Sequence, residues 1–192
     1  KIEESRRDLM VPPPLFLRDI RLFWEKSKMR DLIEQLKDVS DLIDSGQTDK
    51  AYSVLDSLIK ENPNRIEPLI VASQHSFEIL QLDKAKDYIK KAVSINPDDV
   101  SLLKFAGIIF NAAHDHNEAL EYFGKCISLG CKVDSDMLLK QANSYVGVHK
   151  IPQAKLILEH LRSIDKITPD GLVDLSTCVQ YMNQGIEESI QY

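Results

Sequence analysis

The sequence has little glycine, proline or cysteine, and it contains no long hydrophobic run. Only 7 of the 192 residues are glycine and 8 are proline, which excludes collagen-like and linker-like chains and disfavours turn-rich β architectures. No apolar run approaches the roughly 18–20 residues that a membrane-spanning helix needs. The first ten residues are mostly charged, so no signal peptide is visible. Three cysteines at irregular spacing do not form the disulfide framework of a secreted protein.

The charge balance is acidic. Lysine and arginine number 24 and aspartate and glutamate 30, which gives a formal net charge of −6. This balance argues against a nucleic-acid partner, because nucleic-acid binders present basic faces to phosphate. With 43% hydrophobic residues, the chain is long enough to bury a core as one domain or as an array of smaller units. We therefore expect a helical, cytoplasmic protein.

One short sequence motif recurs every 34 or 35 residues. Each copy has an alanine, and a large apolar residue follows four positions later. The alanines are Ala51, Ala85, Ala119 and Ala154, and the apolar residues are Leu55, Ile89, Phe123 and Leu158. Positions four apart lie on one face of a helix, where alanine allows a neighbouring helix to approach closely. In the first two copies, the pairs Asn62-Pro63 and Asn96-Pro97 end the helix that carries the alanine, because proline has no N–H and disfavours the α conformation of the preceding residue.

A second helical pattern precedes each alanine. These patterns cover residues 32–45, 67–80, 100–113 and 136–148. Each unit is therefore predicted to be a helix, a short turn and a second helix.

These units resemble the tetratricopeptide repeat (TPR) family. Its signature has small and large apolar residues in the first helix, then Ala, an aromatic residue, Ala and a closing Pro in the second. The third unit matches best, with Ala106, Gly107 and Phe110 in its first helix, although Cys131 stands in place of the closing proline. In the first unit, Val39 stands where glycine is usual.

The resemblance implies an all-α fold, a right-handed α-solenoid of helix-turn-helix repeats. Four repeats would cover residues 32–166, at about 32–65, 66–99, 100–134 and 135–168. Residues 1–31 would then form an N-terminal extension and capping helix, and residues 169–192 a C-terminal helix that is a cap or a truncated fifth repeat. Ser189 lies in the register of the repeated alanine. Because Ile186 and Ile190 are apolar, whereas a cap usually has a polar outer face, we expect the array to continue beyond Tyr192.

The N-terminal segment differs in charge from the rest of the chain. Residues 1–30 hold eight basic and five acidic residues, a net charge of 8 − 5 = +3 against −9 for the remainder. We interpret this segment as a helix that covers apolar surface of the first repeat. The alternative is a basic amphipathic anchor, between Leu15 and Lys28, for a membrane surface or a partner.

No catalytic or metal-binding motif is visible. The sequence lacks GxGxxG, GxxxxGK, HExxH and CxxC patterns. His114 and His116 flank Asp115 in a predicted turn, but a metal ion would need a third ligand from elsewhere. Cys126 holds a packing position seven residues after Ala119 and is predicted to be a core residue. We predict no enzyme activity, no cofactor and no metal.

The family resemblance implies that the first helices line a concave groove for a peptide or helix of a partner protein. The groove positions carried over are Gln74, Phe77, Glu78, Lys104, Phe105, Ile108, Asn111, Leu139, Lys140, Asn143 and Val146. Apolar side chains mixed with amide and ammonium donors suit an extended or helical segment, although Phe105 and Ile108 could equally pack between helices. We expect Asn111→Ala with Asn143→Ala to weaken partner binding and to change the unfolding temperature little.

The sequence therefore predicts a protein-interaction scaffold or adaptor whose partner is a protein or peptide. Two alternatives stay open. One is a substrate-recruiting TPR domain of a larger enzyme, and the other is a self-assembling or membrane-surface scaffold.

Overall fold

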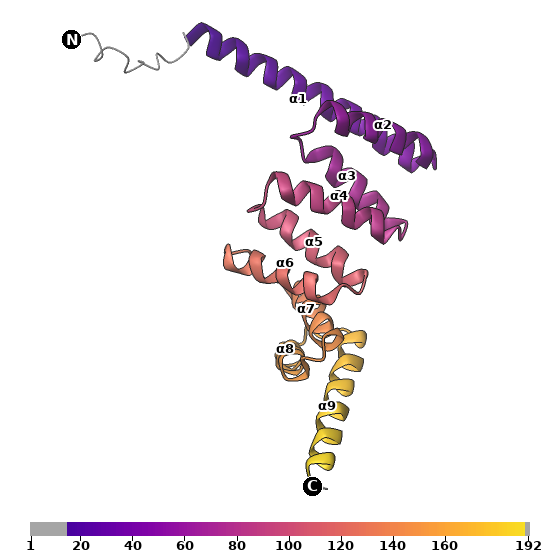
Figure 1. Cartoon of the computed structure of the whole chain (residues 1–192), viewed down its shortest axis with the longest axis vertical. Coiled ribbons are helices and arrows are strands. Elements are labelled where there is room, and N and C mark those ends of the chain that lie inside the picture. Colours follow the sequence, from indigo (N-terminus) through magenta and orange to yellow (C-terminus); the bar gives the residue numbers. More distant parts are fainter. Residues whose placement is uncertain (1–14, 191–192) are drawn as a thin grey trace, which may run out of the picture. The chain divides into compact units, whose positions relative to one another are not determined.

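The computed structural model describes residues 15–190, with side chains for residues 28–182, and this part of the chain contains nine α-helices and no β-strand (Figure 1). The helices are α1 (Leu15–Asp44), α2 (Thr48–Glu61), α3 (Glu67–Glu78), α4 (Leu82–Ile95), α5 (Val100–Ala112), α6 (His116–Ser128), α7 (Ser135–Gly147), α8 (Ile151–Ser163) and α9 (Pro169–Ile190). The chain divides into two compact units, of which one ends at Val54 and the other begins at Leu55.

The first unit contains α1, a single helix of 30 residues. It continues through residue 31, where the N-terminal segment was separated from the first repeat, because no glycine or proline interrupts residues 15–44. The chain reverses after α1 at Gly46, which has a φ of 75°. Two roles were predicted for the N-terminal segment, a cover of the first repeat and an anchor between Leu15 and Lys28. Both depend on side chains before residue 28, which lie outside the described residues.

The second unit is a succession of helix pairs. Helix α3 packs on α4, α5 on α6, and α7 on α8, and each pair packs on the next through α4 and α5 or through α6 and α7. Helix α9 packs on α8 and α7 (Figure 1). Helices α2 and α4 end immediately before Asn62-Pro63 and Asn96-Pro97, as predicted. The prediction of an all-α solenoid built from helix pairs is confirmed.

The repeated alanines and their large partners form the contacts between helices. Ala85, Ala119 and Ala154 are completely buried, and so are the apolar residues four positions after them. In the pair formed by α5 and α6, the ring of Phe123 lies directly against α5 at Gly107, where a Cβ atom would come 2.5 Å from Cε1 of the ring. The small residue on one helix therefore makes room for the large residue on the other.

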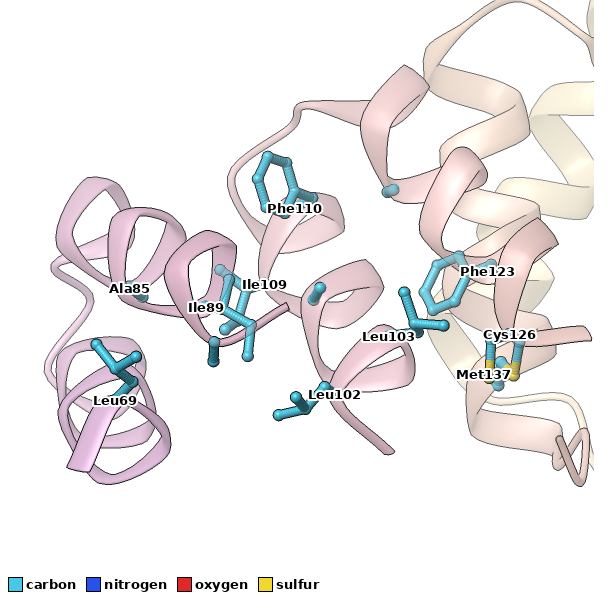
Figure 2. Packing of buried hydrophobic residues seen from close by; sticks show 13 residues of the cluster. Leu69, Ala85, Ile89, Leu102, Leu103, Ile109, Phe110, Phe123, Cys126 and Met137 are labelled. Atoms are coloured by element: carbon cyan, nitrogen blue, oxygen red, sulfur yellow. The ribbon is translucent and has the colours of Figure 1, made fainter. Parts of the chain in front are cut away.

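The core runs along the helix pairs rather than around one centre. One cluster extends from Leu69 in α3 to Met137 in α7 (Figure 2). A second cluster joins α7, α8 and α9 through Ala142, Leu158 and Leu175. Each helix is therefore stabilised by its neighbours in the chain, which is the packing typical of repeat arrays.

The turn inside each pair repeats with the same period. Leu80, His114 and His149 follow α3, α5 and α7, and each has a positive φ, between 58° and 61°. Two backbone hydrogen bonds close each of these turns, for example from His114 N–H to the Asn111 carbonyl and from Asp115 N–H to the Phe110 carbonyl. This pattern satisfies the last carbonyl groups of the first helix and turns the chain into the second.

Candidate binding groove

The predicted groove residues lie on α3, α5 and α7, and most of them are partly used in packing. Gln74 and Glu78 are exposed on α3, where the amide donates a hydrogen bond of 3.0 Å to the carboxylate. Phe77 packs edge-on against Phe105 of α5, with 6.2 Å between ring centroids. These two rings and Ile108 are half-buried against the first core cluster. The apolar anchors of the predicted groove therefore also join neighbouring helices.

Asn111 connects α5 to α7. Its Nδ2 atom donates to the Lys140 carbonyl at 3.0 Å, to Asn143 Oδ1 at 3.0 Å and to Ser144 Oγ at 2.8 Å. Ser144 is completely buried. The amide of Asn111 is thus occupied by the next repeat, which argues against our expectation that removing this side chain leaves the unfolding temperature almost unchanged.

A cavity of about 380 Å³ opens beside this link, between α5, α7 and the start of α9. Four predicted groove residues line it: Asn111, Leu139, Lys140 and Asn143. The other lining residues are Asp136, Thr168, Asp170, Gly171 and Asp174. Close packing of α9 on α7 shapes this cavity, because a Cβ atom on Gly171 would lie 2.8 Å from Cδ2 of Leu139.

The contribution of α9 to this cavity was not predicted. The Thr168-Pro169-Asp170 segment indicates a helix start, and the Thr168 hydroxyl does accept a hydrogen bond of 3.2 Å from Gly171 N–H. That local signal carries no information about which earlier helix α9 packs against. The aspartates of α9 were therefore not identified as groove residues.

Carboxylates outnumber cations around the cavity, with three aspartates against the single ammonium of Lys140. Lys140 forms an ion pair of 3.2 Å with Asp136, one turn earlier in α7. The pKa of the Asp174 carboxyl is raised, chiefly by burial and to a smaller extent by the charge of Asp170. A hydrogen bond with Asn143 lowers this pKa in part. This cavity is consequently a site where a positive charge is favourable.

The two lysines of the predicted groove, Lys104 and Lys140, both have acidic neighbours. Lys104 of α5 pairs with Asp134, and this hydrogen bond raises the pKa of Lys104 and lowers the pKa of Asp134. Val146, the last of the predicted groove residues, is half-buried against the second core cluster. The predicted groove therefore contains one open polar region, the cavity beside α9, and an apolar part that joins helices.

The described residues hold no group of three or more His, Cys, Asp or Glu side chains that could bind a metal ion. His114 and His116 instead pack edge-on against each other, with 5.5 Å between ring centroids. The ring of His116 also fills the space beside α7 at Gly147, where a Cβ atom would lie 2.1 Å from Cδ2. Among the described helices, none combines the length and the hydropathy needed to cross a membrane.

Comparisons with known proteins agree with this architecture. The family model described as tetratricopeptide repeat matches residues 81–99, and no curated protein matches the chain. Among solved structures, that of MamA is similar with a TM-score of 0.64 at 19% identity, covering 80% of this chain and 89% of MamA. A MamA structure from Desulfovibrio magneticus RS-1 has a TM-score of 0.64 at 12% identity, covering 83% and 96%. YrrB, described as a TPR protein with an unusual peptide-binding site, has a TM-score of 0.53 at 17% identity, covering 70% and 68%.

Proposed function

We propose that this chain, whose helix pairs are tetratricopeptide repeats, is a protein-interaction module that binds an extended or helical segment of a partner protein along α3, α5 and α7. The observation that carries this proposal is the cavity between α5, α7 and α9, which is lined by four of the residues that the sequence placed in a binding groove. YrrB, which has a similar fold, is described as having a peptide-binding site. This role assigns no catalytic step to the chain.

The charges at the cavity favour a lysine or arginine side chain in the partner. Three carboxylates face one ammonium, which is itself paired. Asp174 is destabilised as an anion by burial and by Asp170, and a bound cation would relieve both effects. Asn143 also lines the cavity, and its side chain already bonds to Asn111 and to Asp174, so the carboxylates are the groups left to recognise the partner. A hydrogen bond between one of these carboxylates and a lysine or arginine side chain would contribute about 1.5–3 kcal/mol.

A displayed library of random peptides, selected on the immobilised chain, tests this proposal. We expect the selected peptides to be enriched in Lys or Arg, and their affinity to fall by about tenfold or more in the Asp170→Asn, Asp174→Asn double variant. The matched control is Asp87→Asn with Glu121→Gln, which removes the same charge from exposed positions on α4 and α6. An equal loss in both double variants would indicate long-range charge attraction instead of a site, and no loss in either would refute the role of the cavity.

Exposed apolar side chains on α8 and α9 favour a second candidate function, self-association through the C-terminal helices. Leu156 is 71% exposed and Val173 is 65% exposed, and exposed apolar side chains of this kind can mark a protein–protein contact. Light scattering would then show a mass that rises with concentration in the wild-type chain and stays monomeric in Leu156→Lys with Val173→Lys. A concentration-independent monomeric mass for the wild type would eliminate this candidate.

A further inference from the structure

The end of α6 forms a turn that brings two cysteines together. Gly130 has a φ of 79°, its N–H donates to the Ile127 carbonyl at 2.9 Å, and Cys131 N–H donates to the Cys126 carbonyl at 3.1 Å. These are the two hydrogen bonds of a Schellman motif, in which the side chains at the positions of Cys126 and Cys131 usually contact each other. The usual contact is hydrophobic, and here both positions carry thiols.

The two thiols have different environments. Cys126 is completely buried, and its Sγ donates a hydrogen bond of 3.4 Å to the Val100 carbonyl at the start of α5. Burial, followed by a hydrogen bond with Cys131, raises the pKa of Cys126 to about 12. Cys131 is only half-buried, and it packs against the core cluster to which Cys126 belongs. One thiol of the pair is thus accessible, and the other is held beside it.

We propose that Cys126 and Cys131 form a reversible disulfide at the junction of the third and fourth repeats, with a low-molecular-weight disulfide such as oxidised glutathione as the oxidant. The accessible Cys131 thiolate attacks the glutathione disulfide, forms a mixed disulfide and releases one molecule of reduced glutathione. Cys126 then attacks the Cys131 sulfur, its proton passes to the departing thiolate, and a second molecule of glutathione leaves. Two protein thiols are oxidised and one glutathione disulfide is reduced.

The disulfide would change the contact between α5 and α6. The Cys126 S–H group is consumed in the reaction, so its hydrogen bond to the Val100 carbonyl is lost. The remaining cysteine provides an internal comparison, because Cys178 is completely buried in α9 and belongs to the second core cluster. The reaction is therefore expected at the end of α6 and not in α9.

The test uses the full chain equilibrated in buffers of increasing oxidised glutathione, followed by alkylation of free thiols, tryptic digestion and mass spectrometry. Cleavage after Lys125 and Lys132 places both cysteines in one peptide, residues 126–132. We expect this peptide to change from a doubly alkylated form to a form two hydrogen atoms lighter than the reduced peptide, while Cys178 stays alkylatable after unfolding. A stable glutathione adduct on Cys131 would overturn the proposal. So would a peptide that keeps two alkylated thiols at every concentration of oxidised glutathione.

Two further measurements separate a preorganised pair from simple proximity in sequence. The Cys126→Ala variant should accumulate glutathione on Cys131, whereas Cys131→Ala should leave Cys126 unmodified in the folded chain. The equilibrium constant for the disulfide should be at least about tenfold larger in the folded chain than in guanidinium chloride, a difference of about 30 mV. A constant that is equal or smaller in the folded chain would show that the turn does not favour the bond.

Discussion

Replacing Asn111 with alanine should destabilise the junction between the third and fourth repeats. The substitution removes a donor group that contacts the Lys140 carbonyl, Asn143 Oδ1 and Ser144 Oγ. A hydrogen bond contributes about 0.5–1.5 kcal/mol net, and a buried polar group left without a partner costs about 1–3 kcal/mol. The Asn111 amide has two N–H groups for these three acceptors, and Ser144 is fully buried. We therefore expect Asn111→Ala to lower the free energy of unfolding by about 2–3 kcal/mol.

Urea denaturation followed by circular dichroism measures this loss, and hydrogen exchange locates it. Protection should decrease more in α7–α9 than in α3–α4, because contacts in an array are made between neighbouring repeats. The exposed Asn117 of α6 provides the control, since Asn117→Ala should change stability by less than about 0.5 kcal/mol. A double-mutant cycle with Ser144→Ala should give a coupling energy of at least about 0.5 kcal/mol. If Asn111→Ala is as stable as Asn117→Ala, the assignment of Asn111 as a link between repeats is wrong.

Three further predictions concern the α6–α7 region. Gly147→Ala should cost about 1–3 kcal/mol because its Cβ would meet the His116 ring at 2.1 Å. Gly124→Ala, which meets nothing within 4 Å, should instead stabilise by up to about 1 kcal/mol, and thermal unfolding shifts of the same sign for both would contradict this reasoning. Burial and the neighbouring His114 lower the pKa of His116 below its value in the unfolded state, so the unfolded state binds more protons as the pH falls. Between about pH 7.5 and pH 5.5, the wild type should therefore lose more free energy of unfolding than His116→Gln, as measured by denaturant titration. Asp134→Ala removes the side chain that accepts from Met137 N–H, and the free energy of unfolding should fall by about 1–2 kcal/mol. Asp134→Asn keeps a capping oxygen and should recover most of this loss. If it does not, the loss comes from the ion pair with Lys104 of α5.

The helix pairs could be predicted because their determinants are local. Alanine and a large apolar residue one turn apart define the buried face of each second helix, and Asn-Pro marks the end of two of them. The continuity of α1 was not predicted, because the repeat pattern that begins at residue 32 was assigned to a helix separate from the N-terminal segment. Charge alone does not end a helix when no glycine or proline is present.

The candidate site was predicted only in part, because its completion depends on contacts between distant residues. An asparagine on the inner helix face suits a partner peptide and a neighbouring helix equally, and Asn111 bonds to α7, about one repeat later in the sequence. The aspartates of α9 join the cavity through the packing of α9 on α7. The cysteine pair depends on the left-handed conformation of Gly130, which the expected repeat pattern did not include.

The succession of core clusters from α3 to α9 also affects how this chain folds. Contacts between neighbouring helices join residues that are at most about one repeat apart, as in the hydrogen bond between Asn111 and Ser144, which spans 33 positions. Loops of this length are closed at a small entropic cost, and folds with local contacts form quickly. A helix pair can therefore fold on a neighbour that is already formed, and the same physical rule allows such an array to gain or lose a repeat in evolution without redesign of the others.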